Sequence, residues 1–409
     1  MNKAFEFARA WWIKTQLKAP PLLQRTVIPR LHEAKEIIRL LARPYMPVYQ
    51  LQGQGQGGPL TITYVGLEYS KPFLMDLLFV GTPLEQEVGR IPFWRYHELP
   101  DLSSSDMVIV EAAKHLIRRL PHENVIVSLQ YIHHIVDVRG DWQDVCSRFR
   151  GTIRKNELRW IRKYGYEYDV SYDDRDFETF YHGMYLPTMR DRHGKLSSPM
   201  SIGEAYQCFR HGWLFRVKRD QDWVSGVVCL PQQNILIARI LGVKNADMRL
   251  MHEGATAATY YAAIHWANQH RYRAVNFLGT APCLKAGLFQ QKRKWGSSVS
   301  VSPYLHRQIW IKVNYNTPAV SQFLRENPFV VVDDNGKLHG LITVDDPYNI
   351  PAEAKKEWEA CYVTPGLSSL VIRSVSDFAA GPEDINNSDV VIPLPPGAGY
   401  ILVQQSYTE

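Results

Sequence analysis

The feature that most constrains the fold is the order of helical and strand-like patterns between residues 141 and 303. Apolar residues recur at helical spacing in some segments and in short, turn-bounded runs in others. The predicted elements are, in chain order, a helical stretch at 141–165, a strand at 166–172, helices at about 174–188 and 200–210, strands at 213–218, 224–230 and 235–241, an alanine-rich helix at about 247–270, a strand at 274–278, a helix at 282–292 and a strand at 297–303. This order predicts a mixed α/β unit.

Three short motifs in this segment narrow the interpretation. They are Phe149-Arg-Gly-Thr-Ile-Arg-Lys-Asn-Glu-Leu-Arg159 with the following Lys163-Tyr-Gly165, then Thr188-Met-Arg-Asp-Arg-His-Gly194, and finally Lys292-Arg-Lys-Trp-Gly296. The element order resembles that of the GNAT acyltransferase superfamily, and the motifs resemble those of its FemAB-like branch. The resemblance implies an acyltransferase domain at 141–303, in which the acyl donor lies where strands 235–241 and 274–278 part.

The same resemblance bears on the flanking segments, since FemAB-like proteins place two GNAT-like units side by side. It implies a smaller, degenerate unit at 45–140. For this region we predict strands at 47–51, 60–65 and 73–80, a helix at 106–120 and one or two strands within 125–138. The glycine run Gln52–Gly58 lacks a following Lys-Ser or Lys-Thr and is interpreted as a hairpin loop, not a phosphate-binding loop.

The last segment, 304–409, has no recognised resemblance and is expected to form a small α/β or β-rich extension. Asn335-Gly336 between 329–332 and 341–344 predicts a hairpin, and further strands are predicted at 390–392 and 400–403. The predicted fold class is therefore α/β (α+β), with tandem GNAT-like units, mixed central sheets and an extension.

A basic, helical arm is predicted at 1–44. It holds nine basic and three acidic residues, a net of +6 that equals the net charge of the whole chain. Such an arm favours an anionic partner, and we expect it to contact an anionic membrane through Trp11, Trp12 and the bases of residues 1–18. The alternative is that the two tryptophans pack onto the body of the protein.

The acyl donor is left open by the loop before the long helix. Coenzyme A-dependent GNAT enzymes hold pyrophosphate on a glycine-rich loop at a helix N-terminus, but residues 248–256 contain the single glycine Gly254. No tightly bound cofactor is expected. Either acyl-coenzyme A or aminoacyl-tRNA, the donor that the FemAB resemblance implies, would serve as co-substrate.

Candidate site residues follow from the expected position of the donor. Asn276 lies on the predicted strand 274–278 and Thr280 comes just after it, and both are candidates to hold the acyl group or the oxyanion, with strand-end capping as the alternative. Lys292 and Lys294 are candidates to meet phosphate or developing negative charge, and Glu253 is a candidate base that could equally favour the helix dipole. Gly254 and Thr280 are the candidate cofactor-binding residues.

Basic residues in two of the motifs are candidates to bind an anionic substrate. They are Arg154, Lys155, Asn156 and Arg159 in the first motif and Arg190, Arg192 and His193 in the second, with a solvated surface as the alternative for both sets. Five widely spaced cysteines and the absence of paired histidine ligands predict no disulfide framework and no metal.

These inferences lead to a prediction of an N-acyltransferase that moves an acyl or aminoacyl group onto an amine of a polar, anionic acceptor. By resemblance, that acceptor would be a small molecule or a cell-envelope or glycan precursor. A coenzyme A-dependent sugar N-acetyltransferase and a catalytically silent GNAT-like scaffold remain alternatives. The first residues lack a signal-peptide pattern, so a cytoplasmic protein, peripheral to the inner face of the membrane, is expected.

Overall fold

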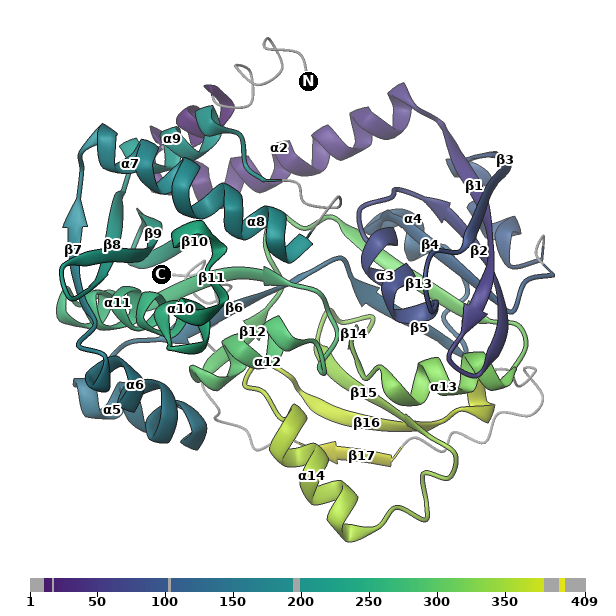
Figure 1. Cartoon of the computed structure of the whole chain (residues 1–409). Helices are drawn as coiled ribbons and strands as arrows, with labels where there is room; N and C mark the ends of the chain where they lie inside the picture. Colours follow the sequence, from purple (N-terminus) through teal and green to yellow (C-terminus); the bar gives the residue numbers. More distant parts are fainter. Residues whose placement is uncertain (1–10, 17, 102–103, 194–198, 379–389, 394–409) are drawn as a thin grey trace.

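The protein is a mixed α/β molecule built on two large sheets, as the sequence predicts (Figure 1). The computed structural model describes residues 11–16, 18–101, 104–193, 199–378 and 390–393. One sheet has ten strands in the order β17-β16-β15-β14-β5-β13-β4-β2-β1-β3, and the other has seven in the order β12-β6-β11-β10-β9-β8-β7. Both sheets contain antiparallel and parallel pairs.

The ten-stranded sheet is assembled from the two ends of the chain. Its strands are β1 (Tyr45–Gly55), β2 (Gly58–Gly66), β3 (Leu84–Pro92), β4 (Met107–Ala113), β5 (Val125–Leu129), β13 (Arg307–Val313), β14 (Phe329–Val332), β15 (Leu338–Val344), β16 (Ser369–Ser374) and β17 (Val390–Pro393). The predicted hairpins are confirmed, because β1 pairs antiparallel with β2 and β14 with β15. The strand predicted at 400–403 lies outside the described residues.

Two predictions in this region are wrong. The strand predicted at 73–80 is the helix α3 (Lys71–Leu78), which has Pro72 in its first turn and buries Leu74, Met75 and Leu78 on one side. The helix predicted at 106–120 is the strand β4, followed by the short helix α4 (Lys114–Ile117). Every residue of β4 is buried, so its continuous apolar run shows none of the alternation that marks a half-buried strand.

The seven-stranded sheet confirms the element order predicted for a GNAT-like unit. Its strands are β6 (Ile132–Asp137), β7 (Glu167–Ser171), β8 (Trp213–Arg219), β9 (Asp222–Gln232), β10 (Ile235–Val243), β11 (Ala274–Thr280) and β12 (Ser297–Ser300). The helices of this half are α5 (Trp142–Ser147), η2 (Ile153–Glu157), α6 (Leu158–Lys163), α7 (Asp174–Phe180), η3 (Tyr181–Tyr185), α8 (Leu186–His193), α9 (Ile202–Arg210), α10 (Met248–His252), α11 (Ala255–Gln269) and α12 (Gly287–Lys294).

Strand pairing runs across the unit boundaries expected at 140 and 304. β6, placed within 45–140, pairs with β11 and β12 of the seven-stranded sheet. Strands β13 to β17, expected in a separate extension, belong to the ten-stranded sheet, where β13 lies between β4 and β5. The helices of this last segment are α13 (Pro318–Glu326) and α14 (Ala352–Tyr362).

The two faces of the seven-stranded sheet are covered by different helices. On one face, alanines and Tyr260 of α11 pack on Phe215, Leu236 and Val275. On the other face, Phe177, Phe180 and Phe209 of α7 and α9 pack on strand residues such as Val228 and Ile240. The alternation of side chains along β10 therefore sends neighbouring residues into different environments.

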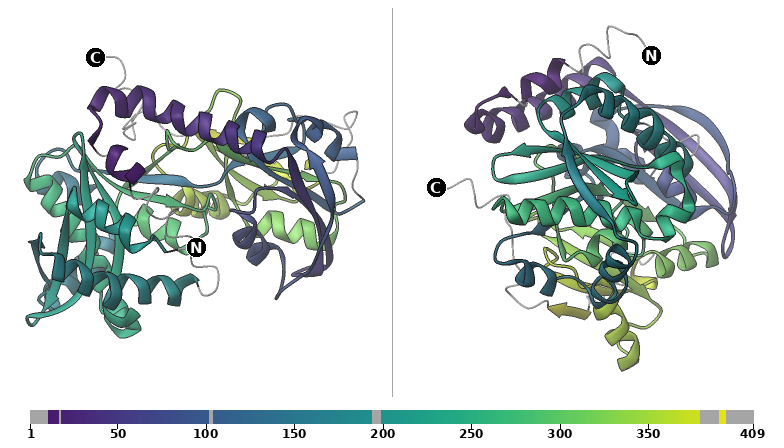
Figure 2. Two further views of the ribbon diagram at one scale, coloured as in Figure 1. Left: turned by 90° about the horizontal axis from the view of Figure 1, so that it is seen from above. Right: turned by 60° about the vertical axis from the view of Figure 1, so that its left-hand side comes forward.

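The N-terminal arm lies across both sheets. A helical turn at 11–16 leads to α2 (Pro21–Ala42), which runs along the outside of the molecule (Figures 1 and 2). Leu40 of α2 packs into the ten-stranded half, and Trp12 is half-buried with its ring 6.0 Å from that of His32. Among the described residues, no helix combines the length and apolarity needed to cross a membrane.

Candidate functional site

Strands β10 and β11 begin as neighbours and then part, as predicted. They pair in parallel through Ile235 with Ala274, Leu236 with Val275 and Ile237 with Asn276, and the pairing ends there although both strands continue. Parting strands expose backbone groups that a continuous sheet would pair. This gap is the structural centre of the candidate site.

Both strands carry an irregularity at the point where they part. In β10, Ala238 and Ile240 oppose consecutive residues of β9, so Arg239 between them is the extra residue of a bulge. In β11 the register shifts between Asn276 and Gly279, and Leu278 has a φ of 59°. Because bulges redirect side chains, they determine which residues face the gap.

Lys292 stabilises the irregular part of β11. Its buried Nζ donates to the carbonyl oxygens of Phe277 at 2.6 Å, Gly279 at 3.0 Å and Leu278 at 3.3 Å. Three donors thus meet three carbonyls of the segment that no longer pairs with β10. Burial lowers the pKa of Lys292 to about 7. The side chain is a positioning group for the strand, since its hydrogens are directed at backbone.

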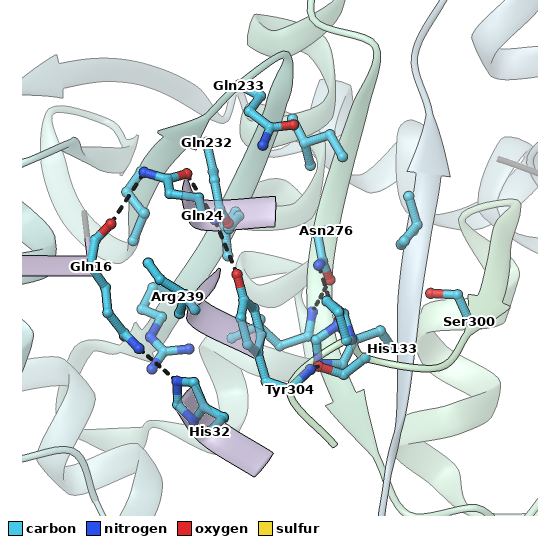
Figure 3. Close-up of a pocket in the computed structure, with 18 of the residues that line it drawn as sticks. Gln16, Gln24, His32, His133, Gln232, Gln233, Arg239, Asn276, Ser300 and Tyr304 are labelled. Atoms are coloured by element: carbon cyan, nitrogen blue, oxygen red, sulfur yellow. Dashed lines mark hydrogen bonds between the residues drawn. The ribbon is translucent and has the colours of Figure 1, made fainter. Parts of the chain in front are cut away.

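A cavity of about 340 Å³ lies over the gap (Figure 3). Its floor comes from β10, β11 and β6 through Ile237, Arg239, Asn276, Leu278 and His133. Further walls come from the N-terminal arm, through Gln16, Gln24 and His32, and from Ser300 at the end of β12 with Ser302 and Tyr304 after it. Three segments distant in sequence therefore enclose one site.

A chain of hydrogen bonds orients His133 on the floor of this cavity. The Leu278 N–H donates to Asn276 Oδ1 at 2.8 Å, which leaves Asn276 Nδ2 to donate to His133 Nδ1 at 3.4 Å. Burial, reinforced by the charges of Lys292 and Arg239, lowers the pKa of His133 to about 4. The neutral ring then carries its proton on Nε2, which has no hydrogen-bond partner among the described residues, so His133 offers an N–H donor.

Arg239 is the cation of the cavity. No described carboxylate lies within ion-pair distance of its guanidinium, in contrast to Arg216, Arg219 and Arg307. Its charge helps to lower the pKa of His133, after burial and Lys292. A half-buried guanidinium that has no counter-ion among the described residues favours a ligand with a carboxylate or phosphate group.

The wall formed by the arm is held by amide groups. Gln24 Nε2 donates to the carbonyls of Ala19 at 2.9 Å and Gln16 at 3.2 Å, and Gln232 Nε2 donates to Gln24 Oε1 at 3.2 Å. The His32 ring lies 5.2 Å from that of Tyr304, and its Nε2 is 2.6 Å from Gln16 Nε2. Burial lowers the pKa of His32, so this wall adds neutral polar groups and no negative charge.

Of the residues predicted for catalysis or cofactor binding, Asn276 alone lines the cavity. Lys292 holds the backbone of β11, and the hydroxyl of the buried Thr280 lies 2.9 Å from His134 Nε2. Glu253, at the end of α10, forms an ion pair with Arg219. Gly254 takes a left-handed conformation before α11 and lies against Trp160, away from the cavity lining.

The residues predicted to bind an anionic substrate also lie outside the cavity lining. The four candidates of the first motif are exposed on η2 and α6: Arg154, Lys155, Asn156 and Arg159. Arg190 is exposed on α8, and Lys294 is half-buried at the end of α12. The side chains of Arg192 and His193 lie outside the described residues. No group of three or more described His, Cys, Asp or Glu side chains has an arrangement that could hold a metal ion.

The sequence predictions missed Arg239, His133 and the polar residues of the arm. A usable signal for Arg239 was its position as the one charged residue in the apolar run Ile235–Val243. Gln16, Gln24 and His32 gave no such signal, since they reach the site only because the arm folds back over strands some two hundred residues further along the chain.

Comparisons with known proteins give only distant likenesses. No family model matches the chain, and no curated protein does. Among solved structures, FemX matches at 13% identity and a TM-score of 0.36 over 74% of this chain and 95% of that chain. The C-terminal domain of a putative lysylphosphatidylglycerol synthetase from Agrobacterium fabrum matches at 12% and 0.35 over 78% and 95%, and L-PGS from Bacillus licheniformis at 12% and 0.32 over 64% and 83%. These values are too low to transfer a function to this chain.

Proposed function

We propose that the protein transfers an acyl group from an activated donor to the amine of an acceptor that carries a carboxylate or phosphate group. The observation that carries the proposal is the gap between β10 and β11, over which a cavity holds Arg239. In the GNAT-like order of elements confirmed for this half, the gap is where an acyl donor is expected. Arg239 supplies the contact that would select an anionic acceptor.

The proposed reaction needs one electrophile, one nucleophile and an oxyanion donor. The lone pair of the acceptor nitrogen attacks the acyl carbon, the bond from that carbon to the leaving sulfur or oxygen breaks, and the amine proton ends on the leaving group. His133 Nε2–H would donate to the carbonyl oxygen as it becomes negative, since the Leu278 and Asn276 contacts fix its tautomer. Orienting the two reactants in the cavity would supply much of the remaining rate.

The donor in this proposal is an aminoacyl ester or another acyl group whose carrier does not depend on a glycine-rich pyrophosphate loop. The chain before α11 forms the helical turn α10, and Gly254 is the single glycine there, with a Cβ position 3.4 Å from Trp160 Cβ. A cell-envelope or glycan precursor fits the acceptor requirement of an amine together with an acid group.

A direct test uses purified protein, aminoacyl-tRNA or acetyl-coenzyme A as donor, and paired acceptors. Each amine acceptor is offered with a free carboxylate or phosphate and as its neutral ester, and products are detected by mass spectrometry. We expect transfer to the anionic acceptor. Arg239→Gln should raise KM for the acceptor about 10- to 100-fold, whereas Arg159→Gln, on the exposed surface, should not change it. Equal transfer to the neutral ester would contradict the proposal.

The role of His133 is separated from that of Arg239 by the kinetic parameter that changes. His133→Phe removes the Nε2–H and should lower kcat about 100-fold with little change in KM, the effect seen when an oxyanion donor is lost. His133→Gln keeps a donor and should recover part of the rate.

A ligand-binding protein without catalysis is the second candidate, favoured by the lack of any carboxylate among the cavity-lining residues, which leaves no acidic base there. This candidate predicts that anionic amines bind in the cavity, that Arg239→Gln abolishes this binding, and that no acyl group is transferred from any donor. A sugar N-acetyltransferase, in contrast, predicts transfer from acetyl-coenzyme A to an uncharged amino sugar and little dependence on Arg239.

A further inference from the structure

Helix α2 has two apolar sides, and the described residues cover only one of them. The inner side packs Ile28 and Leu40 against the protein and pairs Glu36 with the buried Arg307 at 2.6 Å. The outer side presents large aliphatic residues at helical spacing that are between 40% and 64% exposed: Leu23, Val27, Leu31, Ile38 and Leu41. Figure 2 shows this helix along the outside of the molecule. Surface helices normally turn their apolar stripe toward the core, so an exposed outer stripe indicates that another molecule binds to this side of the helix.

The charges around this stripe are nearly all positive. Exposed bases of the described arm are Lys14, Lys18, Arg30, Lys35, Arg39 and Arg43. The acids within residues 11–43 are Glu33, which is exposed, and Glu36, which is half-buried in its ion pairs with Arg39 and Arg307. The occupant should therefore be anionic as well as apolar.

A second copy of α2 fits this surface poorly. Apolar residues recur along α2 at alternating intervals of four and three, which is the spacing of the contact line between two paired helices. They are Val27, Leu31, Ala34, Ile38 and Leu41. Arg30 and Lys35 occupy the flanking positions of that contact line. Pairing α2 with itself in either direction would place bases beside bases with no acid to compensate, so the charges act against a dimer.

Exposed aromatic residues stand at both ends of the stripe. Trp11 precedes α2, while Tyr45 follows it and lies 6.1 Å from Trp94 between ring centroids. Tryptophan and tyrosine are enriched where a protein meets the boundary between lipid and water. A helix of 22 residues extends about 33 Å, long enough to lie along such a boundary.

We infer that the outer side of α2 docks on an anionic phospholipid surface, with the aliphatic stripe entering the acyl boundary and the bases meeting the headgroups. The inner side of the same helix lines the cavity through Gln24, Ile28 and His32, so docking places the site beside the lipid. The sequence alone directs attention to residues 1–18, whereas the exposed stripe moves the contact to residues 23–41. This inference does not depend on acyl transfer.

Vesicle co-sedimentation of the full chain tests it without an activity readout. Phosphatidylcholine vesicles with and without phosphatidylglycerol are compared at low and high salt. We expect binding to the anionic vesicles alone, weakened by salt. Leu31→Gln with Ile38→Gln should reduce binding more than ten-fold, and Arg30→Gln with Lys35→Gln should reduce it about five-fold per charge at low salt.

The matched control replaces two exposed apolar residues elsewhere, Met248→Gln with Leu288→Gln, and should bind as the unaltered protein does. Equal melting temperatures for all variants show that each is folded. The inference is overturned if the unaltered protein ignores anionic vesicles at low salt, or if the stripe variant binds them equally well. It is also overturned if the protein is a dimer that the stripe variant dissociates, because the occupant would then be a second copy.

Discussion

The two faces of the seven-stranded sheet use their residues for different purposes. The face under α11 is filled by aromatic rings, with Trp295 stacked on Tyr260 at 5.9 Å and edge-on to Phe149 at 5.2 Å between centroids. The opposite face leaves a cavity between the strands and the N-terminal arm, with Arg239 and His133 on its floor. Phe149 and Trp295 belong to the motifs on which the family resemblance depends, yet both lie on the packed face.

A motif can therefore mark a fold because its residues hold the core and the backbone, without any of them lining a site. Phe149, which follows α5, and Trp295, which follows α12, pack against α11, while Lys292, in the same motif as Trp295, supports the irregular end of β11. The groups that face the cavity are single polar residues within apolar strands. Substitutions on one face should therefore change stability, and substitutions on the other should change binding and transfer.

The largest expected effect is that of Lys292→Met. Methionine keeps the length of the side chain but leaves the carbonyls of Phe277, Leu278 and Gly279 without their donor, so we expect a loss of about 2–4 kcal/mol in the free energy of unfolding. Denaturant unfolding measures it, with Lys294→Met, half-buried two residues away, as the matched control. An unchanged unfolding midpoint for Lys292→Met would show that β11 holds its shape without this side chain.

The second prediction concerns stability between pH 7 and pH 5. The folded state holds the pKa of His133 at about 4, and the unfolded value is about 6.5, so the unfolded chain binds the proton first as pH falls. Stability should therefore decrease across this window, by at most about 1.4 kcal/mol per pH unit from this residue. His133→Gln should make the decrease shallower. Burial also lowers the pKa of His134, so part of the slope should remain. A slope identical in both proteins would contradict the burial of a neutral His133.

The sequence predicted β10 and β11 as neighbouring parallel strands because the turn residues and the helix between them indicate the same arrangement. Turn residues separate β8, β9 and β10, and the alanine-rich helix must cross over before β11 can pair in parallel with β10. The prediction of secondary structure failed where complete burial removes the alternation of apolar and polar residues. In β4 the continuous apolar run is typical of a buried strand and of a buried helix alike.

The site was predictable only in part, because its members come from distant segments. Asn276 was identified through its strand, but Arg239 faces the cavity because of a bulge that no local pattern reveals. The sequence also gives no indication of which strand belongs to which of the two sheets. Only two residues separate Leu129, which ends β5 in one sheet, from Ile132, which begins β6 in the other, and such a crossing depends on tertiary pairing.

The third prediction is that acetyl-coenzyme A binds with a Kd of about 1 mM or weaker. The chain leading to α11 forms the helical turn α10, and Gly254, which lies against Trp160, is the single glycine there, so close approach of the backbone to a pyrophosphate is harder than on a glycine-rich loop. Isothermal calorimetry measures the affinity. Micromolar binding that is lost on Gly254→Ala would move the donor site to the face covered by α11.

The smallest effect is expected for Glu253→Gln. Glu253 pairs with Arg219 near the protein surface, where both side chains are partly exposed, and such pairs contribute about 0.2–1 kcal/mol. Arg219→Gln should lose the same pair and also its contact with the Tyr164 ring, and the double variant should lose no more than Arg219→Gln alone, since each substitution already removes the pair. If Glu253 were a general base instead, Glu253→Gln would lower kcat about 100-fold or more while Arg219→Gln would not. Measuring unfolding and transfer on the three variants distinguishes an ion pair on the packed face from a catalytic group, because an ion pair leaves kcat unchanged in all three, whereas a catalytic Glu253 lowers kcat only in the two variants that lack its carboxylate.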